Sequence, residues 1–437
     1  MVKQMNKNQA AMTPPMGWNS WDCYGPAVNE EQLLGNARYM AENLKEYGWE
    51  YVVCDIQWSE PAAGTTGWAY RPFAQLTLDE YGRQLPAPNR FPSAANGKGF
   101  APIAEEIHGM GLKFGIHIMR GVPRLAVHKQ LPVLGTDKTC DQIASEYSTC
   151  RWNSDMYGID ARREGAQAYY DSIFRLYAQW GVDFVKVDDI CNTNNYPQDP
   201  YSGEKEIEMI RRAIDSSGRQ MVLSLSPGPA VIEKAWHLRK NANMWRITDD
   251  FWDDWKLLRE MFERCEVWQR QVSEGCWPDC DMLPLGQIRV AADGVGEYTH
   301  FTHDEQITML TLWSIFRSPL ILGGELRKND EWTLSLLQNS EVLRLNRESF
   351  GAEQLYRGDG QAAWKSFDRD GGVYAALFNL SETERTVAAD LAEIGISGSF
   401  TLRDLWKRED IGTVSDTVKA VIPAHGARLY KLVKENA

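Results

Sequence analysis

The feature that most restricts the fold is an alternation of two patterns along residues 14–345. Short apolar runs rich in β-branched residues alternate with longer stretches whose apolar residues recur every three to four positions. Runs that are apolar throughout are typical of parallel strands covered by helices on both faces. The clearest runs are 51–58, 113–119, 184–190, 221–226, 244–249 and 319–324, with 16–21 as the first strand and 280–286 in the seventh.

Amphipathic helices are expected in the intervals. Asn29 and Gln32 form a capping-box pattern before the first of them, and Gly48 marks its end. Further helices are expected at about 100–111, 162–180, 203–216, 228–240, 254–268 and 303–318. Eight strand–helix units predict an α/β fold, a (β/α)8 TIM barrel over residues 12–347. The long segment 120–160 after the third strand would then help to shape the active site.

The pattern changes after residue 350. Strand-like segments follow one another without helices, at 362–368, 373–380, 385–391, 400–406 and 421–433. Turn pairs such as Asp370-Gly371 separate them. This spacing predicts a C-terminal antiparallel β-sandwich over 350–437, and a chain of 437 residues suits one large domain with a smaller one.

Composition narrows the partners of the chain. A formal net charge of -13 argues against nucleic acid or an anionic membrane as a partner. Residues 1–15 lack the apolar stretch of a signal peptide, and no run is long enough for a membrane helix. The 8 cysteines are dispersed and match no zinc pattern, so we expect reduced thiols in a cytoplasmic protein. The oligomeric state, including a homo-oligomer, stays open.

Polar residues gather where the predicted strands end, which is where barrel enzymes hold their active sites. They are Asp55, His117, Lys186, Asp188, Asp189, Ser226, Arg246, Asp249, Asp250 and Asp281. The set lacks the histidine clusters of a metallohydrolase, so we expect no metal and no cofactor. Two carboxyl groups are what glycoside hydrolysis requires, and the 17 tryptophans suit sugar rings. A glycosidase acting on a small glycoside or oligosaccharide is therefore favoured, while Asp189 and Asp249 are interpreted as helix caps or solvated loop charges.

Spacing alone leaves two other classes open. Lys186 with these aspartates could serve a metal-dependent or Schiff-base lyase, and Gly323-Gly324 could accommodate a phosphate. A non-catalytic sugar-binding protein would show a similar set of polar residues.

Four ordered motifs favour the glycosidase. PPMGWNSWD (14–22), VKVDDI (185–190), WRITDDFWDDW (245–255) and WPDCDML (277–283) resemble glycoside hydrolase family 27, the α-galactosidase or melibiase family. The resemblance covers about residues 12–345 and implies a retaining mechanism. Asp188, two positions after Lys186, would be the nucleophile, and Asp250, four positions after Arg246, the general acid/base. Retention predicts about 5–5.5 Å between the two carboxyl groups.

The resemblance also implies sugar-binding residues. Trp21 would line the apolar face of the ring, and Asp55 and Asp281 match sugar-contacting positions. Lys186 would bind hydroxyls and keep Asp188 ionised, while Arg246 would bind near the 2-hydroxyl or orient carboxylates. His117 occupies the position of a family tyrosine, where it either tunes Asp188 or is structural.

One departure from the family motif bears on the substrate. Where the family usually has two adjacent aspartates after strand two, this chain has Asp55-Ile56. The second carboxylate normally binds the 4- and 6-hydroxyl side of galactose, and losing it costs roughly 1–3 kcal/mol. β-L-Arabinopyranose is α-D-galactopyranose without its hydroxymethyl group, and some family members are β-L-arabinopyranosidases. Ile56 therefore favours an arabinopyranoside over an α-D-galactoside, unless it merely packs beneath the site.

Two further departures concern the loops after strands four and five. Relatives that accept a 2-acetamido sugar have Ser at position 226 and Ala three positions on, but here Pro229 follows. α-N-Acetylgalactosaminidase is therefore the third substrate alternative. Secreted relatives join these loops by a disulfide, whereas this chain has Ile190 and Leu225 at both positions, which supports a reducing compartment.

Overall fold

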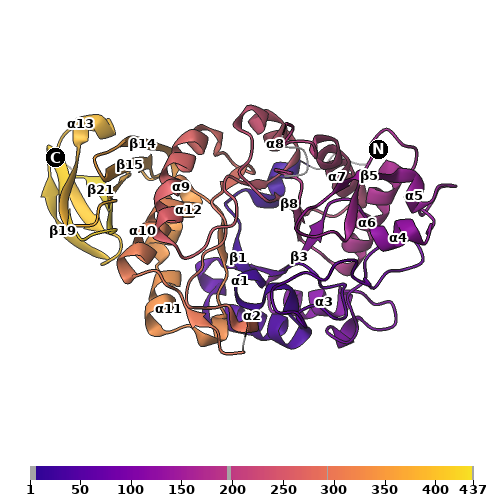
Figure 1. Ribbon diagram of the computed structural model, residues 1–437. Coiled ribbons are helices and arrows are strands. Elements are labelled where there is room, and N and C mark those ends of the chain that lie inside the picture. The colour runs from indigo at the N-terminus through magenta and orange to yellow at the C-terminus, as the bar shows by residue number, and fades with distance from the viewer. Residues whose placement is uncertain (1–5, 194–197, 293, 436–437) are drawn as a thin grey trace.

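The computed structural model describes residues 6–193, 198–292 and 294–435, so the first five residues and the last two of the predicted 350–437 domain lie outside it (Figure 1). Eight parallel strands form one curled sheet in the order β10-β9-β8-β7-β3-β2-β1-β13. They are β1 (Met16–Asn19), β2 (Tyr51–Cys54), β3 (Lys113–Met119), β7 (Phe184–Asp188), β8 (Val222–Leu225), β9 (Met244–Arg246), β10 (Trp277–Asp279) and β13 (Leu320–Leu322).

The segment after β10 closes this sheet into a barrel. The amide of Leu283 donates to the carbonyl of Ile321 at 2.7 Å, and Gly323 donates back to Leu283 at 3.0 Å. The prediction that 280–286 forms the seventh strand is therefore corrected, because the strand itself ends at Asp279. Asp281 has a left-handed backbone with φ of 77°, which turns the chain away from β9 and towards β13.

Helices surround the barrel, as predicted (Figure 1). The main ones are α2 (Glu30–Asn43), α3 (Ala101–Gly109), α6 (Ala166–Trp180), α7 (Glu204–Ser217), α8 (Ala235–Asn241), α9 (Trp255–Trp268), α10 (His303–Phe316), α11 (Glu331–Leu337) and α12 (Ser340–Glu348). The capping box of Asn29 and Gln32 is confirmed. The helix predicted from residue 228 begins only at Ala235, because Pro227 and Pro229 lack the amide hydrogens a helix needs.

Two loops at the carboxyl ends of the strands have structure of their own. The insertion 120–160 contains a three-stranded sheet, β4 (Val122–Pro123), β5 (Ala144–Thr149) and β6 (Met156–Ile159), with α4 (Arg124–His128) and α5 (Cys140–Ile143). A short helix, α1 (Trp21–Tyr24), follows β1 directly. Both segments lie next to the polar strand ends.

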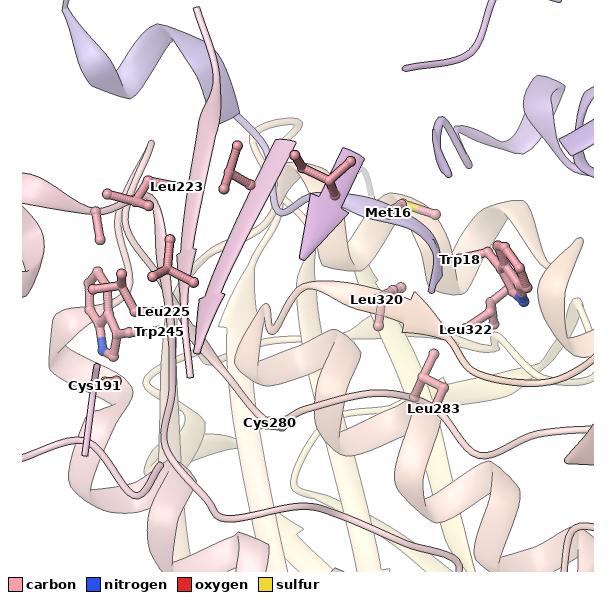
Figure 2. Packing of buried hydrophobic residues seen from close by; sticks show 14 of the residues in the cluster. Met16, Trp18, Cys191, Leu223, Leu225, Trp245, Cys280, Leu283, Leu320 and Leu322 are labelled. Atoms are coloured by element: carbon pink, nitrogen blue, oxygen red, sulfur yellow. The ribbon is translucent and has the colours of Figure 1, made fainter. Parts of the chain in front are cut away.

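Successive residues of each barrel strand belong to different cores. Leu223, Leu225 and Trp245 belong to the large core of buried residues that strands and helices share (Figure 2). Val222 and Met244, each directly before one of these residues in the chain, belong to a second apolar cluster. This is the period of two expected for strands, and it separates an outer core from a barrel interior.

The interior cluster lies at the amino-terminal end of the strands. Its members are Ala11, Tyr51, Val53, Phe184, Val222, Met244 and Trp277. The first 3-10 helix (Lys7–Ala11) covers this end, and Trp277 Nε1 donates to the Ala11 carbonyl at 2.8 Å. The chain therefore seals one end of the barrel with apolar side chains and leaves the other end to polar ones.

The C-terminal segment forms the predicted antiparallel β-sandwich, drawn in yellow in Figure 1. Its strands are β14 (Phe350–Gly358), β15 (Gln361–Phe367), β16 (Val373–Asn379), β17 (Arg385–Asp390), β18 (Phe400–Asp404), β19 (Glu409–Val414), β20 (Thr417–Ile422) and β21 (Ala427–Lys434), with α13 (Leu391–Ile394). The predicted strand 421–433 is two strands, because the turn at Pro423–Gly426 separates β20 from β21. The sandwich contacts α10, where Trp406 Nε1 donates to Thr311 Oγ1 at 2.9 Å. Among the described residues, no helix has the length and apolarity to cross a bilayer.

Candidate active site

The polar strand ends surround one cavity of about 250 Å³. Of the polar residues predicted at the strand ends, all but Asp189 and Ser226 line it, as do Trp21 and Ile56. The lining residues are Trp21, Asp22, Asp55, Ile56, Tyr70, His117, Trp152, Lys186, Asp188, Pro227, Arg246, Asp249, Asp250, Phe251, Trp252, Asp281 and Met282. Side chains of β3, β7 and β9, and of the segments that directly follow β1, β2 and β10, thus meet at the carboxyl end of the barrel.

The alternation along β7 shows how the site is positioned. Val185 and Val187 belong to the outer core, so Phe184, Lys186 and Asp188 point inward. Phe184 lies in the apolar cluster below, whereas Lys186 and Asp188 line the cavity. The change from the apolar interior to the polar site therefore takes place within two positions of one strand, from Phe184 to Lys186.

Asp188 is held by contacts to both of its carboxylate oxygens. His117 Nε2 lies 3.0 Å from Oδ2, and the amide of Asp189 donates to Oδ1 at 2.8 Å. Burial opposes ionisation of this group, but His117 and the charge of Lys186 outweigh it and hold the pKa of Asp188 below its ordinary value. The carboxylate is consequently ionised at neutral pH, as a nucleophile has to be.

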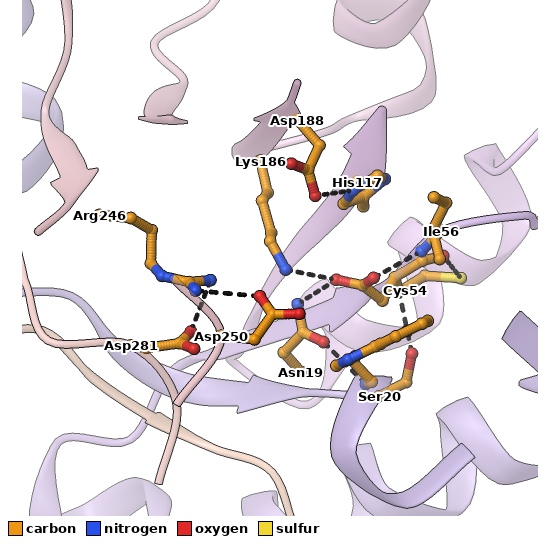
Figure 3. A network of polar contacts seen from close by, with 12 residues as sticks. Asn19, Ser20, Cys54, Ile56, His117, Lys186, Asp188, Arg246, Asp250 and Asp281 are labelled. Carbon is orange, nitrogen blue, oxygen red and sulfur yellow. Dashed lines mark hydrogen bonds and ion pairs between the residues drawn. The ribbon is translucent and has the colours of Figure 1, made fainter. Parts of the chain in front are cut away.

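Lys186 links the end of β7 to the end of β2. Its Nζ donates to Asp55 Oδ2 at 3.1 Å, and Asn19 donates to the same oxygen at 2.7 Å (Figure 3). Burial would raise the pKa of Asp55, but Lys186 outweighs it and the pKa lies well below its ordinary value. Burial also opposes the charge of Lys186, yet Asp55 and Asp188 raise its pKa. Lys186 and Asp55 thus form a charged pair. Both residues line the cavity, where they can form further hydrogen bonds with a ligand.

Arg246 joins two carboxylates on the opposite part of the wall. Its Nη1 lies 2.8 Å from Asp281 Oδ1, and its Nη2 donates to Asp250 Oδ1 at 3.0 Å (Figure 3). Asp281 is buried and also accepts from the amide of Phe251 at 2.8 Å, whereas the side chain of Asp250 is 58% exposed. Asp250 therefore lies at the open side of the cavity, where it can exchange protons with water or a leaving group.

Ile56 gives the cavity an apolar wall. It is buried among Ala74, Leu76, Met119, Cys150 and Met156, and Trp21 and Tyr70 pack against this group. The rings of Trp21 and Tyr70 stack with centroids 6.2 Å apart. No carboxylate occupies the position of Ile56, so this wall offers a ligand van der Waals contact instead of hydrogen bonds.

Two residues, Ser226 and Asp189, differ from their predicted environments, and a third, Asp249, agrees with its prediction. Ser226 is buried without a partner for its hydroxyl and does not line the cavity, where Pro227 stands instead. Asp189 is neither a helix cap nor a solvated charge, because it is buried and paired with Arg120 at 2.8 Å. Burial raises the pKa of Asp189 to about 6. Asp249 is an exposed loop carboxylate, as predicted.

Sequence reasoning missed several lining residues. Tyr70 comes from the long β2–α3 loop, Trp152 from the insertion, and Trp252 and Met282 from loops after β9 and β10. Asp22 was passed over although it directly follows Trp21. The position of each next to a predicted strand end or in a long βα loop was the available signal.

The structure also bears on the alternative chemistries. A carbon atom added at Gly323 would lie 1.9 Å from Asp22 Oδ2, so the glycine pair adjoins a carboxyl group rather than an anion site. Among the described residues, one group has metal-ligand spacing, Glu204, Glu208 and His237. None of these three lines the cavity, and Lys234 lies 2.6 Å from Glu204.

Comparison with known proteins decides the family. The model described as alpha galactosidase A matches residues 161–348, and the alpha galactosidase C-terminal beta sandwich domain matches residues 358–432. A solved GH27 β-L-arabinopyranosidase from Geobacillus stearothermophilus is 56% identical, with a TM-score of 0.95 over 99% of this chain and 98% of that chain. The chain belongs to glycoside hydrolase family 27.

Relatives of this family 27 hydrolase are named for three sugars. An Asp→Ala variant of the Geobacillus enzyme, solved with arabinose, is 55% identical with a TM-score of 0.96, over 99% of this chain and 100% of that one. A putative α-N-acetylgalactosaminidase from Bacillus halodurans is 52% identical with a TM-score of 0.87, over 97% of both chains. An α-galactosidase from Arabidopsis thaliana is 24% identical over 100% of this chain and 93% of its own length. Family membership thus gives the reaction class, and the cavity has to indicate the sugar.

Proposed function

We propose that this family 27 hydrolase is a retaining exo-glycosidase that prefers terminal β-L-arabinopyranosides over α-D-galactopyranosides. The observation that carries the proposal is the apolar wall at Ile56, where a galactose-binding relative would need a hydrogen-bonding partner for the hydroxymethyl side. The 56% identical arabinopyranosidase supports the same choice.

In the proposed mechanism, Asp188 attacks the anomeric carbon while Asp250 protonates the departing oxygen. Asp250 then removes a proton from water, which hydrolyses the glycosyl ester on Asp188. His117 and Lys186 keep Asp188 ionised before attack, and the His117 contact and the Lys186 charge also stabilise it as it departs in the second step.

Asp250 needs a proton in the first step although Arg246 lies beside it. Asp281 binds the other side of the same guanidinium at 2.8 Å, so Asp250 shares that charge. Asp250 is also the more exposed of the two carboxyl groups, which gives it access to solvent protons. These features support the acid/base role for Asp250 and a positioning or sugar-binding role for Asp281.

The test is the ratio of kcat/KM on p-nitrophenyl β-L-arabinopyranoside to that on the α-D-galactopyranoside. We expect the wild type to favour the arabinopyranoside, and Ile56→Asp to lower the ratio by roughly tenfold or more, because it provides a partner for the hydroxymethyl side. Ile56→Val is the matched control, and it should leave the ratio nearly unchanged. A ratio that Ile56→Asp does not alter would contradict the role given to this residue.

α-N-Acetylgalactosaminidase is the second candidate, because the Bacillus halodurans relative carries that name. Ser226 gives it little support, since its side chain is buried away from the cavity wall. Turnover of p-nitrophenyl 2-acetamido-2-deoxy-α-D-galactopyranoside above that of both other substrates would establish this candidate instead.

We further propose that the enzyme works in the cytoplasm. All eight cysteines are free and buried, and Cys265 and Cys280 remain thiols with their sulfur atoms 3.5 Å apart. Thiol titration of the denatured protein, purified without reductant, should find eight reactive groups. A homo-oligomer remains compatible with the sequence, and light scattering would identify one.

A further inference from the structure

Among the residues that the structure describes, none forms a hydrogen bond with the carboxyl group of Asp22. It lies on α1, lines the cavity and is 2% exposed. Its Oδ2 is buried without a partner, and no hydrogen bond joins Oδ1 to any residue that the structure describes. Buried polar groups are almost always hydrogen-bonded, so an unpartnered carboxyl group on a residue that lines a ligand cavity requires a partner, which a bound ligand can supply.

The protein makes room for this carboxyl group. The three atoms closest to a carbon added at Gly323 all belong to Asp22, with Oδ2 at 1.9 Å and Cγ at 2.4 Å. Gly323 has no positive φ, so a larger residue is excluded here by the carboxyl group and not by the backbone conformation. The end of β13 therefore holds a glycine where Asp22 needs space.

The charges around Asp22 favour its neutral form. Burial is the main cause that raises the pKa of Asp22 well above its ordinary value, and the Asp281 carboxyl group adds to it. The charged groups that face it come from several elements and comprise Asp281, Lys186, Asp250, Asp55 and Arg289. The two cations are bound to other carboxylates, Lys186 to Asp55 and Arg289 to Asp253. Asp22 is thus left with a proton to donate.

We propose that Asp22 is a further substrate-binding residue, which donates a hydrogen bond from a protonated carboxyl oxygen to a hydroxyl group of the terminal sugar. This proposal rests on the sugar site described above and adds a donor near Asp281 in its wall. A neutral carboxyl group costs less to bury than a carboxylate, and the sugar supplies the acceptor that the protein lacks.

Substitutions of Asp22 test whether its carboxyl group donates a hydrogen bond to the sugar. Asp22→Ala should lower kcat/KM by roughly tenfold or more and weaken inhibition by L-arabinose to a similar extent. Asp22→Asn keeps a donor in the same place at every pH, so it should stay within about threefold of the wild type. A loss in Asp22→Asn as large as in Asp22→Ala would overturn the neutral donor, and full activity in Asp22→Ala would overturn the binding role.

Thermal stability provides a readout that separates binding from a structural role. Because the carboxyl group of Asp22 is not hydrogen-bonded to any described residue, both variants should unfold at the temperature of the wild type or above it. Asp404 is the matched control, since it is buried in the β-sandwich and accepts from the amides of Trp406 and Lys407. Asp404→Ala should lower the unfolding temperature and leave L-arabinose inhibition unchanged. A lower unfolding temperature for Asp22→Ala with unchanged sugar binding would assign Asp22 to the fold.

Gly323→Ala tests the same position without changing Asp22. The added methyl group would displace the carboxyl group, so L-arabinose inhibition should weaken as it does in Asp22→Ala. Unchanged inhibition in the folded variant would contradict the proposal. All these comparisons use the glycoside that the wild type hydrolyses best, together with thermal protection by L-arabinose and D-galactose. If the wild type hydrolyses the galactoside better than the arabinopyranoside, the arabinopyranoside assignment is refuted, and the role of Asp22 is then tested on the galactoside.

Discussion

The two ends of the barrel interior are built from the same strands but hold opposite kinds of side chain. At the amino-terminal end, inward residues form an apolar cluster that includes Tyr51, Phe184, Met244 and Trp277. Two or four residues later, on the same strands or just beyond their ends, the residues that line the cavity include Asp55, Lys186, Arg246 and Asp281. The residues at the amino-terminal end remove apolar surface from water, which stabilises the fold. The residues at the carboxyl-terminal end carry charges in a largely buried site. Such charges need one another as partners, because burying an unpaired charge destabilises the fold.

The comparison assigns stability to one end and chemistry to the other. β7 makes the contrast sharpest, because Phe184 and Asp188 point into the same interior from one strand of five residues. Substitutions at these two positions should therefore affect different measured quantities.

Asp188→Ala should lower kcat by roughly 10⁴-fold or more, because the proposed mechanism has no other nucleophile. Azide should restore part of the turnover by entering the space that the carboxylate leaves. Attack from that side gives a glycosyl azide of inverted configuration, which NMR of the product identifies. The unfolding temperature should change little, since no contact is lost in the apolar cluster at the amino-terminal end of the barrel.

The control for this variant is its neighbour. Asp189 is paired with Arg120, so Asp189→Asn should lower the unfolding temperature and give no rescue by azide. An inverted azide product from Asp250→Ala, and none from Asp188→Ala, would show that the two roles are reversed.

Phe184→Ala should have the reverse profile. The ring is buried against Tyr51, with centroids 5.5 Å apart, and its removal should lower the free energy of unfolding by about 3–5 kcal/mol. The kcat/KM of the folded fraction should stay within about threefold of the wild type. Chemical denaturation and kinetics below the unfolding transition measure the two quantities. Phe184→Leu, which retains most of the apolar volume, should cost less, and a kinetic defect without a stability loss would contradict the division.

Much of this arrangement could be predicted from the sequence. The barrel, the sandwich and most helices follow from periodicity, which records burial residue by residue. Asp188 and Lys186 follow from position, because charged residues that interrupt an apolar run at its carboxyl end have to point into the site. Family resemblance added their roles, which periodicity does not encode.

The remaining features depend on contacts between distant segments. Leu283 closes the barrel through hydrogen bonds to β13, and a strand of three residues leaves almost no periodic signal. Tyr70 and Trp152 reach the cavity from long loops, where Tyr70 packs against the Ile56 cluster and Trp152 packs against Tyr70. Asp22 resembles a helix-terminal carboxylate in sequence, and only the structure shows that no described residue is hydrogen-bonded to it.

Asp279 provides the finest test, because it lies on β10 midway between apolar Trp277 and charged Asp281. Burial, reinforced by the Asp281 charge, raises the pKa of Asp279 to about 7 from an ordinary value of 3.8. Between these values the folded protein holds a proton that the unfolded chain has lost. The free energy of unfolding should therefore fall as pH rises, by on the order of 1 kcal/mol per pH unit from this group.

Asp279→Asn removes this titration but keeps the oxygen that accepts from the amide of Asp281 at 2.9 Å. Its stability should consequently decline less between pH 4 and pH 7 than that of the wild type. Denaturant titrations at several pH values measure the difference between the two slopes. Equal slopes would mean that Asp279 is already ionised in the folded barrel, and the boundary between the apolar and the charged interior would then lie below it, at Trp277.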